Sequence, residues 1–344
     1  MKRSHQITLN DIARRLKVSK VTVSKALRDH PDISLATKRK VKKTAEELGY
    51  TPNFLARNLS SKRSNTIGLV VPKIAHHFFA SVIESIYDTA FQNNYEIVLM
   101  VSQENAKREV QHIKTLLSMR VDGFLISVTE QTTDISIFKT IKKMAIPLIF
   151  FDRIINNCST SSVTTDDEGG AQLAVDHAIR TGYRDIGHLA GFSYTNIGRD
   201  RHTGFKKAMA KHHLPINPSW VIEGGFSEQD GYDGFMQLYS NGKLPQIIFA
   251  VTFPVALGAF TAMKENGLLI PDDIDLICFG DSDYNKFISP TLTCVDQPAD
   301  ELGKKAVEAL IEEIEQPENR KPQRIVIPTK LNIHETCLYN NHDQ

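Results

Sequence analysis

The sequence predicts an α/β protein: an N-terminal helix-turn-helix domain, a short joining segment, and a body of doubly wound parallel sheets in two lobes. Two observations support this. Residues 1–64 hold sixteen Lys and Arg against five Asp and Glu, a net charge of +11, whereas the rest of the 344-residue chain has a net charge of −10. From Thr66 onward, short apolar runs alternate with amphipathic stretches, as strands and helices do in parallel sheets.

The charge asymmetry indicates that one part of the protein contacts a polyanion. A solvated basic face without a partner is the alternative, and it holds only if the basic segment has no recognition architecture. A length of 344 residues suits two or three domains.

The basic segment contains three short helical patterns. The first begins at Thr8, where Asp11 three residues later makes a capping-box pattern, and continues with an apolar stripe. Ser19 can cap a second helix over residues 20–27, whose Val23, Ala26 and Leu27 face inward. The turn between these two helices is about three residues, the length found in helix-turn-helix pairs.

A third helix is predicted from Ser34 through Val41, Ala45 and Leu48, with Gly49 as its C-cap. Three helices around a small core, with polar residues exposed on the second, are typical of a DNA-reading module. A small helical domain that binds protein is the alternative, and the basic charge favours DNA.

The start of the second helix would enter the major groove first, so Lys20 and Val21 are the candidates for base contacts, with Lys25 one turn further along. Phosphate contacts are more plausible for Thr22, Ser24 and Arg28. Thr8 and Ser19, at the two helix starts, complete the predicted DNA-binding set of the head.

The segment that follows, PNFLARNLSSKRSNT, places Ala56 and Leu59 at helical spacing. About eight helical residues do not hold a helix in water, because nucleation outweighs so few hydrogen bonds. We therefore expect residues 53–60 to become ordered only when another surface packs against them.

In the body we expect strands at TIGLVVP, YEIVLMVS, GFLISV, IPLIFFD, IGHLAG, WVIEGG, QIIFAV and DLICFGD. Helices are expected around 78–93, 106–119, 134–143, 167–181, 198–212, 228–241, 255–266 and 300–315. Eight strands suit two similar lobes better than one sheet. Neither a GxGxxG after a strand nor a GxxxxGK[ST] motif occurs, so a dinucleotide or P-loop site is unsupported.

The sequence offers no sign of a membrane or secretory protein. The N-terminus lacks the apolar run of a signal peptide, and eighteen apolar residues never follow one another. Cys158, Cys278, Cys294 and Cys337 show no metal-ligand spacing, and most lie in or beside apolar strand-like runs. We expect reduced thiols, no metal, no cofactor, and a location in the cytoplasm.

The N-terminal stretch TLNDIARRLKVSKVTVSKALRDHPDISLATKRKVKKTAEELGYTPNFLARNL closely resembles the DNA-binding head of the LacI/GalR (lactose-repressor) family. The resemblance continues through the body, over roughly residues 7–335, in VDGFLI, FFDR, TTDDEGGAQLAVDHAIRTGYRDIGHLAG, RHTGFKKAM, VALGAFTAM and SPTLTCVDQP. The family's core is similar to periplasmic sugar-binding proteins, with two lobes joined by three crossovers.

The resemblance implies a head at 1–51, a hinge helix and linker at 52–65 and a core at 66–340. Crossovers would fall near Thr164, Thr293 and Pro328. The N-lobe would then comprise about 66–164 and 294–327, and the C-lobe about 165–293 and 328–340.

In the family, two hinge helices pair in the DNA minor groove, where one leucine wedges between base pairs. Leu59 matches that leucine, Ala56 would face the partner's hinge, and Arg57 and Asn53 flank them. The resemblance thus implies a homodimer on a palindromic operator. Because the chain ends near Gln344 without a leucine-repeat tail, a dimer is expected rather than a tetramer.

The resemblance also places an effector between the lobes, at the carboxyl ends of strands. Arg201 matches the family's effector-contacting arginine and Asp281 an aspartate after DLICFG; an arginine fork opposed by an aspartate suits a hydroxyl-rich or carboxylate-bearing ligand. Aromatic rings that could stack on a sugar or base are Phe78, Phe79 and Phe226. The remaining positions of the predicted effector set are Ser127, Asp152, Arg153, Thr252 and Gln297.

Two positions depart from the family pattern. Thr252-Phe253 stands where Asn-Asp is usual, which removes a polar ligand contact, and Phe279-Gly280-Asp281 stands where Gly-Tyr/Phe-Asp is usual. An effector therefore cannot be copied from a known member.

The expected function is a transcription regulator, usually a repressor, that a sugar-like small molecule controls. An enzyme with a DNA-binding head is the alternative, since His76, His77, His188, His202, His212 and His213 could include a base. No nucleophile–base spacing accompanies them. A transport-type sugar-binding protein is disfavoured by the head and by the missing signal peptide.

Overall fold

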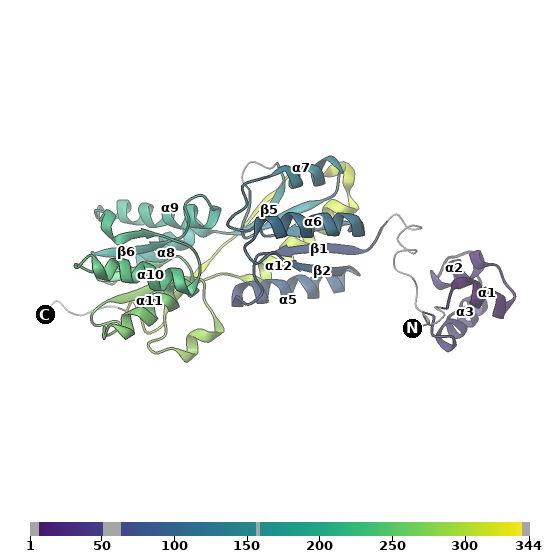
Figure 1. The fold of residues 1–344 in the computed structure, drawn as a ribbon, viewed down its shortest axis with the longest axis horizontal. Coiled ribbons are helices and arrows are strands. Elements are labelled where there is room, and N and C mark those ends of the chain that lie inside the picture. Colours follow the sequence, from purple (N-terminus) through teal and green to yellow (C-terminus); the bar gives the residue numbers. More distant parts are fainter. Residues whose placement is uncertain (1–6, 51–62, 156–158, 339–344) are drawn as a thin grey trace. The chain divides into compact units, whose positions relative to one another are not determined.

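The computed structural model describes residues 7–50, 63–155 and 159–338 (Figure 1). The chain divides into two compact units, Met1–Ser64 and Asn65–Gln344. We describe each unit by itself.

The first unit is a three-helix head made of α1 (Leu9–Leu16), α2 (Lys20–Leu27) and α3 (Leu35–Glu47). Ser19 caps α2 by accepting a hydrogen bond from the Thr22 amide at 3.0 Å, and Ser34 caps α3 in the same way through Thr37. The buried core consists of Ile12, Ala13, Val23, Ala26, Val41 and Ala45. The three helices predicted from the sequence are confirmed.

The first lobe of the second unit is built on a six-stranded parallel sheet in the order β11-β5-β4-β3-β1-β2. Its strands are β1 (Thr66–Val71), β2 (Glu96–Val101), β3 (Gly123–Ile126), β4 (Leu148–Phe151), β5 (Ser161–Thr165) and β11 (Arg324–Ile327). Apolar side chains alternate between its two faces. Helices α5 (His77–Gln92) and α12 (Ala299–Glu315) pack on one face, and α6 (Ala106–Met119) and α7 (Ser136–Lys143) on the other.

The second lobe repeats this plan with the order β12-β10-β9-β8-β6-β7. Its strands are β6 (Ile186–Ala190), β7 (Val221–Glu223), β8 (Ile247–Ala250), β9 (Asp275–Phe279), β10 (Thr293–Asp296) and β12 (Lys330–Asn332), the last antiparallel to β10. Helices α8 (Asp167–Arg180) and α9 (Asn196–Lys211) cover one face, and α10 (Glu228–Ser240) and α11 (Phe253–Glu265) the other. Short 3-10 helices lie at Pro218–Trp220 (η1) and Asp283–Phe287 (η2) in this lobe, and at Pro317–Asn319 (η3) after α12 in the first lobe.

The chain passes between the lobes three times, after β5, after β10 and after β11. The second passage follows Asp296 rather than Thr293, because β10 pairs with β9 of the second sheet; residues 294–296 therefore belong to the second lobe and not, as expected, to the first. The eight predicted strands are present. β5, β10, β11 and β12 were missed: polar residues interrupt the apolar run in β5 (SSVTT), β10 (TCVD) and β12 (KLN), whereas β11 (RIVI) was missed despite its three apolar residues.

Among the described residues, no helix combines the length and the apolar character needed to span a bilayer. Cys278, Cys294 and Cys337 are buried free thiols, and Cys158 lies outside the described residues.

Candidate functional site

The head exposes the start of α2, as a DNA-reading helix requires. Lys20 is exposed, and the Val21 side chain is 63% exposed although it is apolar. Because Val21 is exposed, its side chain adds little to the stability of the head by burial, and its methyl groups are free to contact a thymine methyl group. Ser19 and Thr22 are joined by their hydroxyls at 2.8 Å, beside the cap that starts the helix.

Other predicted DNA contacts are held by partners within the head. Lys25 Nζ lies 2.7 Å from Asp32 Oδ2, and the Arg28 guanidinium donates to the backbone carbonyl and the hydroxyl of Ser24. The Thr8 hydroxyl donates to Asp11. These exposed polar contacts contribute little stability and can be exchanged for phosphates. Asn53, Ala56, Arg57 and Leu59 lie outside the described residues.

In the second unit, a cavity of about 320 Å³ opens where the carboxyl ends of strands from both lobes face each other. Ligands of open α/β sheets bind at this edge. The structure brings together in its wall every residue of the predicted effector set except Ser127: Phe78, Phe79, Asp152, Arg153, Arg201, Phe226, Thr252, Asp281 and Gln297.

Arg201 on α9 is 1% exposed and fixed on three sides. Its Nε and Nη2 lie 2.8 and 2.7 Å from Asp167 Oδ1, its Nη1 donates to the Val251 carbonyl at 2.7 Å, and its Cζ lies 3.7 Å from the centroid of the Phe279 ring. The expected partner Asp281 does not oppose it. Asp167 was missed because only the fold brings the start of α8 beside α9.

Asp152 follows β4 and adopts a left-handed backbone conformation with φ 57°. Burial raises the pKa of its carboxyl to about 6, although Arg153 and Arg201 lie near enough to oppose this. Ser127 is fully buried behind Asp152, to which its hydroxyl donates at 3.5 Å, and it does not line the cavity. Contrary to the prediction, Ser127 does not line the cavity and instead contacts Asp152, which does.

Asn196, the first residue of α9, joins the two lobes and was not predicted from the sequence. Its Nδ2 donates to the Asp152 carbonyl at 2.9 Å, and its Oδ1 accepts from the Ile154 amide at 3.0 Å. One buried carboxamide of the second lobe thus holds the backbone of the first lobe on both sides of Arg153. A polar residue at a helix start gave a weak signal, but its partners lie more than forty residues away.

Arg153 is 6% exposed, and its Nη1 donates to Glu104 Oε1 at 2.7 Å. Its guanidinium also lies 5.1 Å from the centroid of the Phe226 ring, which belongs to the other lobe. The buried Nε atom has no hydrogen-bond partner within the described residues.

The remaining wall is largely aromatic. Phe78 and Phe79 meet edge to face with ring centroids 5.5 Å apart, and Phe226 is buried. Thr252 caps α11 by accepting from the Val255 amide at 3.4 Å, so its hydroxyl is partly occupied, and the adjacent Phe253 lines the cavity. The departure Thr252-Phe253 therefore replaces a polar wall by an apolar one.

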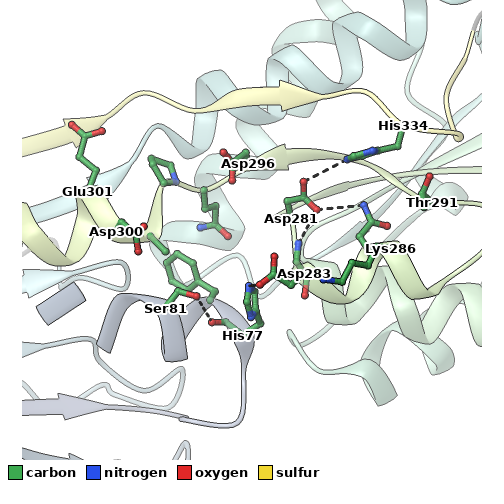
Figure 2. A pocket seen from close by; sticks show the side chains of 16 residues that line it. His77, Ser81, Asp281, Asp283, Lys286, Thr291, Asp296, Asp300, Glu301 and His334 are labelled. Carbon is green, nitrogen blue, oxygen red and sulfur yellow. Dashed lines mark hydrogen bonds and ion pairs between the residues drawn. The ribbon is translucent and has the colours of Figure 1, made fainter. Parts of the chain in front are cut away.

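Figure 2 shows a second, larger hollow of about 650 Å³ that adjoins this cavity. Asp281 projects into it and is occupied by its own lobe: its carboxylate accepts from Asn285 and Asn332 and lies 3.6 Å from His334 Nε2. His77 of the first lobe lies 3.9 Å from Asp283 of the second. Since these polar groups have partners, we assign the candidate site to the smaller, more buried cavity.

Two of the histidines considered as possible bases have structural partners. Burial lowers the pKa of His188 to about 3; its ring stacks on Phe205 and Phe249, and its Nδ1 bonds the Phe249 carbonyl at 2.9 Å. His212 pairs with Asp176 on the outer surface. Within the described ranges, no three His, Cys, Asp or Glu side chains are grouped to hold a metal ion.

Two family models match separate parts of the chain. Residues 8–53 match the family described as bacterial regulatory proteins, lacI family. Residues 175–337 match the periplasmic binding protein-like domain.

Individual relatives match over nearly the whole chain. The HTH-type transcriptional repressor PurR of Pasteurella multocida (strain Pm70) is 32% identical over 93% of this chain and 95% of the relative. Catabolite control protein A of Priestia megaterium is 31% identical over 88% and 91%. The crystal structure of the lac repressor dimer bound to operator and the anti-inducer ONPF superposes with a TM-score of 0.86 at 26% identity, covering 97% of this chain and 100% of that one.

Proposed function

The chain belongs to the lacI family of bacterial regulatory proteins, and on this premise we propose that it binds a palindromic operator as a homodimer under the control of a cleft ligand. The family membership makes it a DNA-binding transcription repressor with a sugar-binding-like domain rather than an enzyme. The proposal adds the operator symmetry, the dimer and the effector, a sugar or sugar derivative.

The observation that supports the effector site most strongly is the cavity itself. Residues spread from Phe78 to Gln297 along the chain, and from both lobes, meet around about 320 Å³. A pocket of this size, mostly apolar with a few convergent polar groups, is typical of small-molecule sites.

The contacts across the cleft explain how a ligand could act at a distance. Asn196 and Phe226 of the second lobe contact residues 152–154 of the first lobe. Because Phe226 and Asp152 also line the cavity, binding of a ligand there would be coupled to closure of the two lobes. A ligand can change DNA affinity only by binding one lobe arrangement better than another. In our proposal the closed arrangement changes the geometry of β1, through which the first lobe continues from the head.

An exposed apolar surface on α5 supports the homodimer. Phe91 is 77% exposed and Tyr87 41%, and α5 packs beside the edge strand β2. Exposed apolar groups of this kind mark interaction sites, and the lac repressor relative is a dimer. Phe91→Glu should give monomers in sedimentation velocity and lower DNA affinity, whereas Glu84→Gln, on the same helix, should leave the dimer intact.

The function is tested with full-length protein and an operator selected from random duplexes. We expect the selected sequence to be palindromic. We also expect DNA affinity, measured by fluorescence anisotropy at fixed salt, to respond to one member of a panel of sugars, sugar acids, sugar phosphates and purines.

A matched pair of variants locates the effector site. The double variant Arg201→Met with Asp167→Asn, which removes both charges of the buried pair, should lose the effector response. Lys207→Met, on the same helix as Arg201, breaks an exposed ion pair with Glu168 of α8 and should keep the response. An unchanged response in the double variant would remove the cavity from the proposal.

A further inference from the structure

One corner of the cavity is lined by the first turn of α5. His76, the N-cap residue, makes no side-chain capping bond, and its Nδ1 atom is buried without a hydrogen-bond partner within the described residues. The helices α9, α10 and α11, which also begin at the cleft, are capped by Thr195, Ser227 and Thr252. The sixteen-residue α5 thus points uncapped amide groups, and the positive end of its dipole, at the cavity.

Arg153 gives a second, independent reason to expect a ligand group here. Its side chain is more than nine-tenths buried, lines the same cavity, and has an Nε atom without a partner, while Glu104 occupies only its Nη1. A guanidinium N–H can donate and never accept, and leaving a buried donor unpaired is costly. The missing partner must therefore be an acceptor.

The charged groups that shift the pKa of His76 are all cationic. Burial lowers the pKa of His76 to about 4, and Arg153, Lys73, His77 and Arg201 lower it further by repulsion. The ring is therefore neutral at physiological pH and keeps one N–H to donate. Lys73 lines the cavity and is exposed.

Carboxylates also lie near this corner: the charges of Arg153 and Lys73 act on Glu130, opposing the rise of its pKa that burial causes, and Glu228 and Asp281 line the same cavity. Glu104 is bonded to Arg153 Nη1, and its second oxygen accepts from the Glu130 amide. Asp167 is occupied by Arg201. Asp152 accepts from Ser127, and burial weakens its ionisation by raising its pKa to about 6. No carboxylate of the described residues forms a hydrogen bond with Arg153 Nε or His76 Nδ1, so these two atoms remain available to a ligand.

We propose that the cleft ligand carries an oxyanion, a carboxylate or a phosphate, which binds between Arg153, His76 and Lys73 at the start of α5. Oxyanions suit this position because helix N-termini and arginine bind them with charge-assisted hydrogen bonds. The Phe79 and Phe226 rings are left for the uncharged part of the ligand. The inference rests on the proposed function, since it names the class of effector that the cleft would take.

The test compares matched neutral and acidic ligands on the full-length protein by isothermal titration calorimetry. Glucose is paired with glucuronate and with glucose 6-phosphate, galactose with galacturonate, and inorganic phosphate and acetate serve as fragments. We expect the acidic member of at least one pair to bind about tenfold or more tightly than the neutral one. That advantage should shrink as the salt concentration rises.

Variants assign the effect to this corner. Arg153→Gln should abolish the preference for the acidic ligand. Lys73→Gln, at an exposed position where the fold is not at risk, should reduce it. Lys286→Gln, in the adjoining hollow, should leave it unchanged.

The outcomes separate this inference from the proposed function. Neutral sugars that bind as tightly as their acids, or a failure of every acid, phosphate and acetate to bind, would overturn the oxyanion subsite and leave the cleft as a candidate for another ligand. A preference for the acid that Lys73→Gln and Arg153→Gln do not alter would also overturn it. An acid that binds through Arg153 without changing DNA affinity would uphold the subsite and contradict the proposed function.

Discussion

Replacing Asn196 by alanine should open the cleft. The substitution removes two hydrogen bonds between the lobes, 2.9 Å to the Asp152 carbonyl and 3.0 Å from the Ile154 amide. Each is worth about 1 kcal/mol net, because both backbone groups reach water once the lobes separate. The closed arrangement should lose roughly 2 kcal/mol, which is about a 30-fold shift of the closed-to-open ratio.

The shift can be measured by double electron–electron resonance in a Cys158→Ser background, since the other three cysteines are buried. Spin labels at Lys114→Cys on α6 and Lys206→Cys on α9, both exposed, report the distance between the lobes. We expect Asn196→Ala to gain a longer-distance population. Asn217→Ala, which removes a side-chain cap on η1 away from the cleft, should not. Identical distance distributions for the two variants would refute the role of Asn196 in closure.

Three further predictions concern single groups. Ser19→Ala and Ser34→Ala each remove an equivalent N-cap, and each should lower the free energy of unfolding of the head by about 1 kcal/mol in chemical denaturation. Only Ser19→Ala should weaken DNA binding beyond that loss of stability. Equal DNA affinity of the two variants would contradict a DNA contact by Ser19. Burial raises the pKa of Glu109 from 4.5 to about 7, so the folded state holds this proton more tightly than the unfolded state does. The free energy of unfolding should therefore fall by roughly 3 kcal/mol as the pH rises from about 4.5 through 7. Glu109→Gln should make the free energy of unfolding nearly independent of pH over that range, and an unchanged pH dependence would show that Glu109 is not its source. Arg201→Met alone leaves the charge of the Asp167 carboxylate buried without its ion-pair partner and should lower the free energy of unfolding by about 3–5 kcal/mol. Adding Asp167→Asn should restore most of that loss. If urea titrations show that the losses of the two single variants simply add, the two residues are not coupled.

Most helices and strands could be predicted from local sequence patterns. The capping signal at Thr8 and the serines at 19 and 34 define the head because caps act within three residues of each helix start. The body helices were found by their apolar periodicity. β5, SSVTT, was missed because polar side chains fill a strand that two neighbouring strands nevertheless hold.

The sequence identified most of the predicted effector residues that line the candidate cavity, but not the contacts among them. Arg201 and Asp281 were correctly placed at the cleft, but their assumed opposition was wrong because Asp167 is the carboxylate that lies against Arg201. Asn196 and Asp152 meet only because the two lobes face each other. No spacing in the sequence encodes such a contact between residues 44 positions apart.

The central claim, that the cleft and the DNA-binding head share one equilibrium, is tested most directly by measuring both affinities in both states. DNA affinity is determined with and without the tightest-binding acid of the titration panel, and the affinity for that acid is determined with and without operator. Linkage requires the two ratios to be equal, and we predict a common factor clearly different from one. A DNA affinity that stays constant while the cleft becomes saturated would contradict the account.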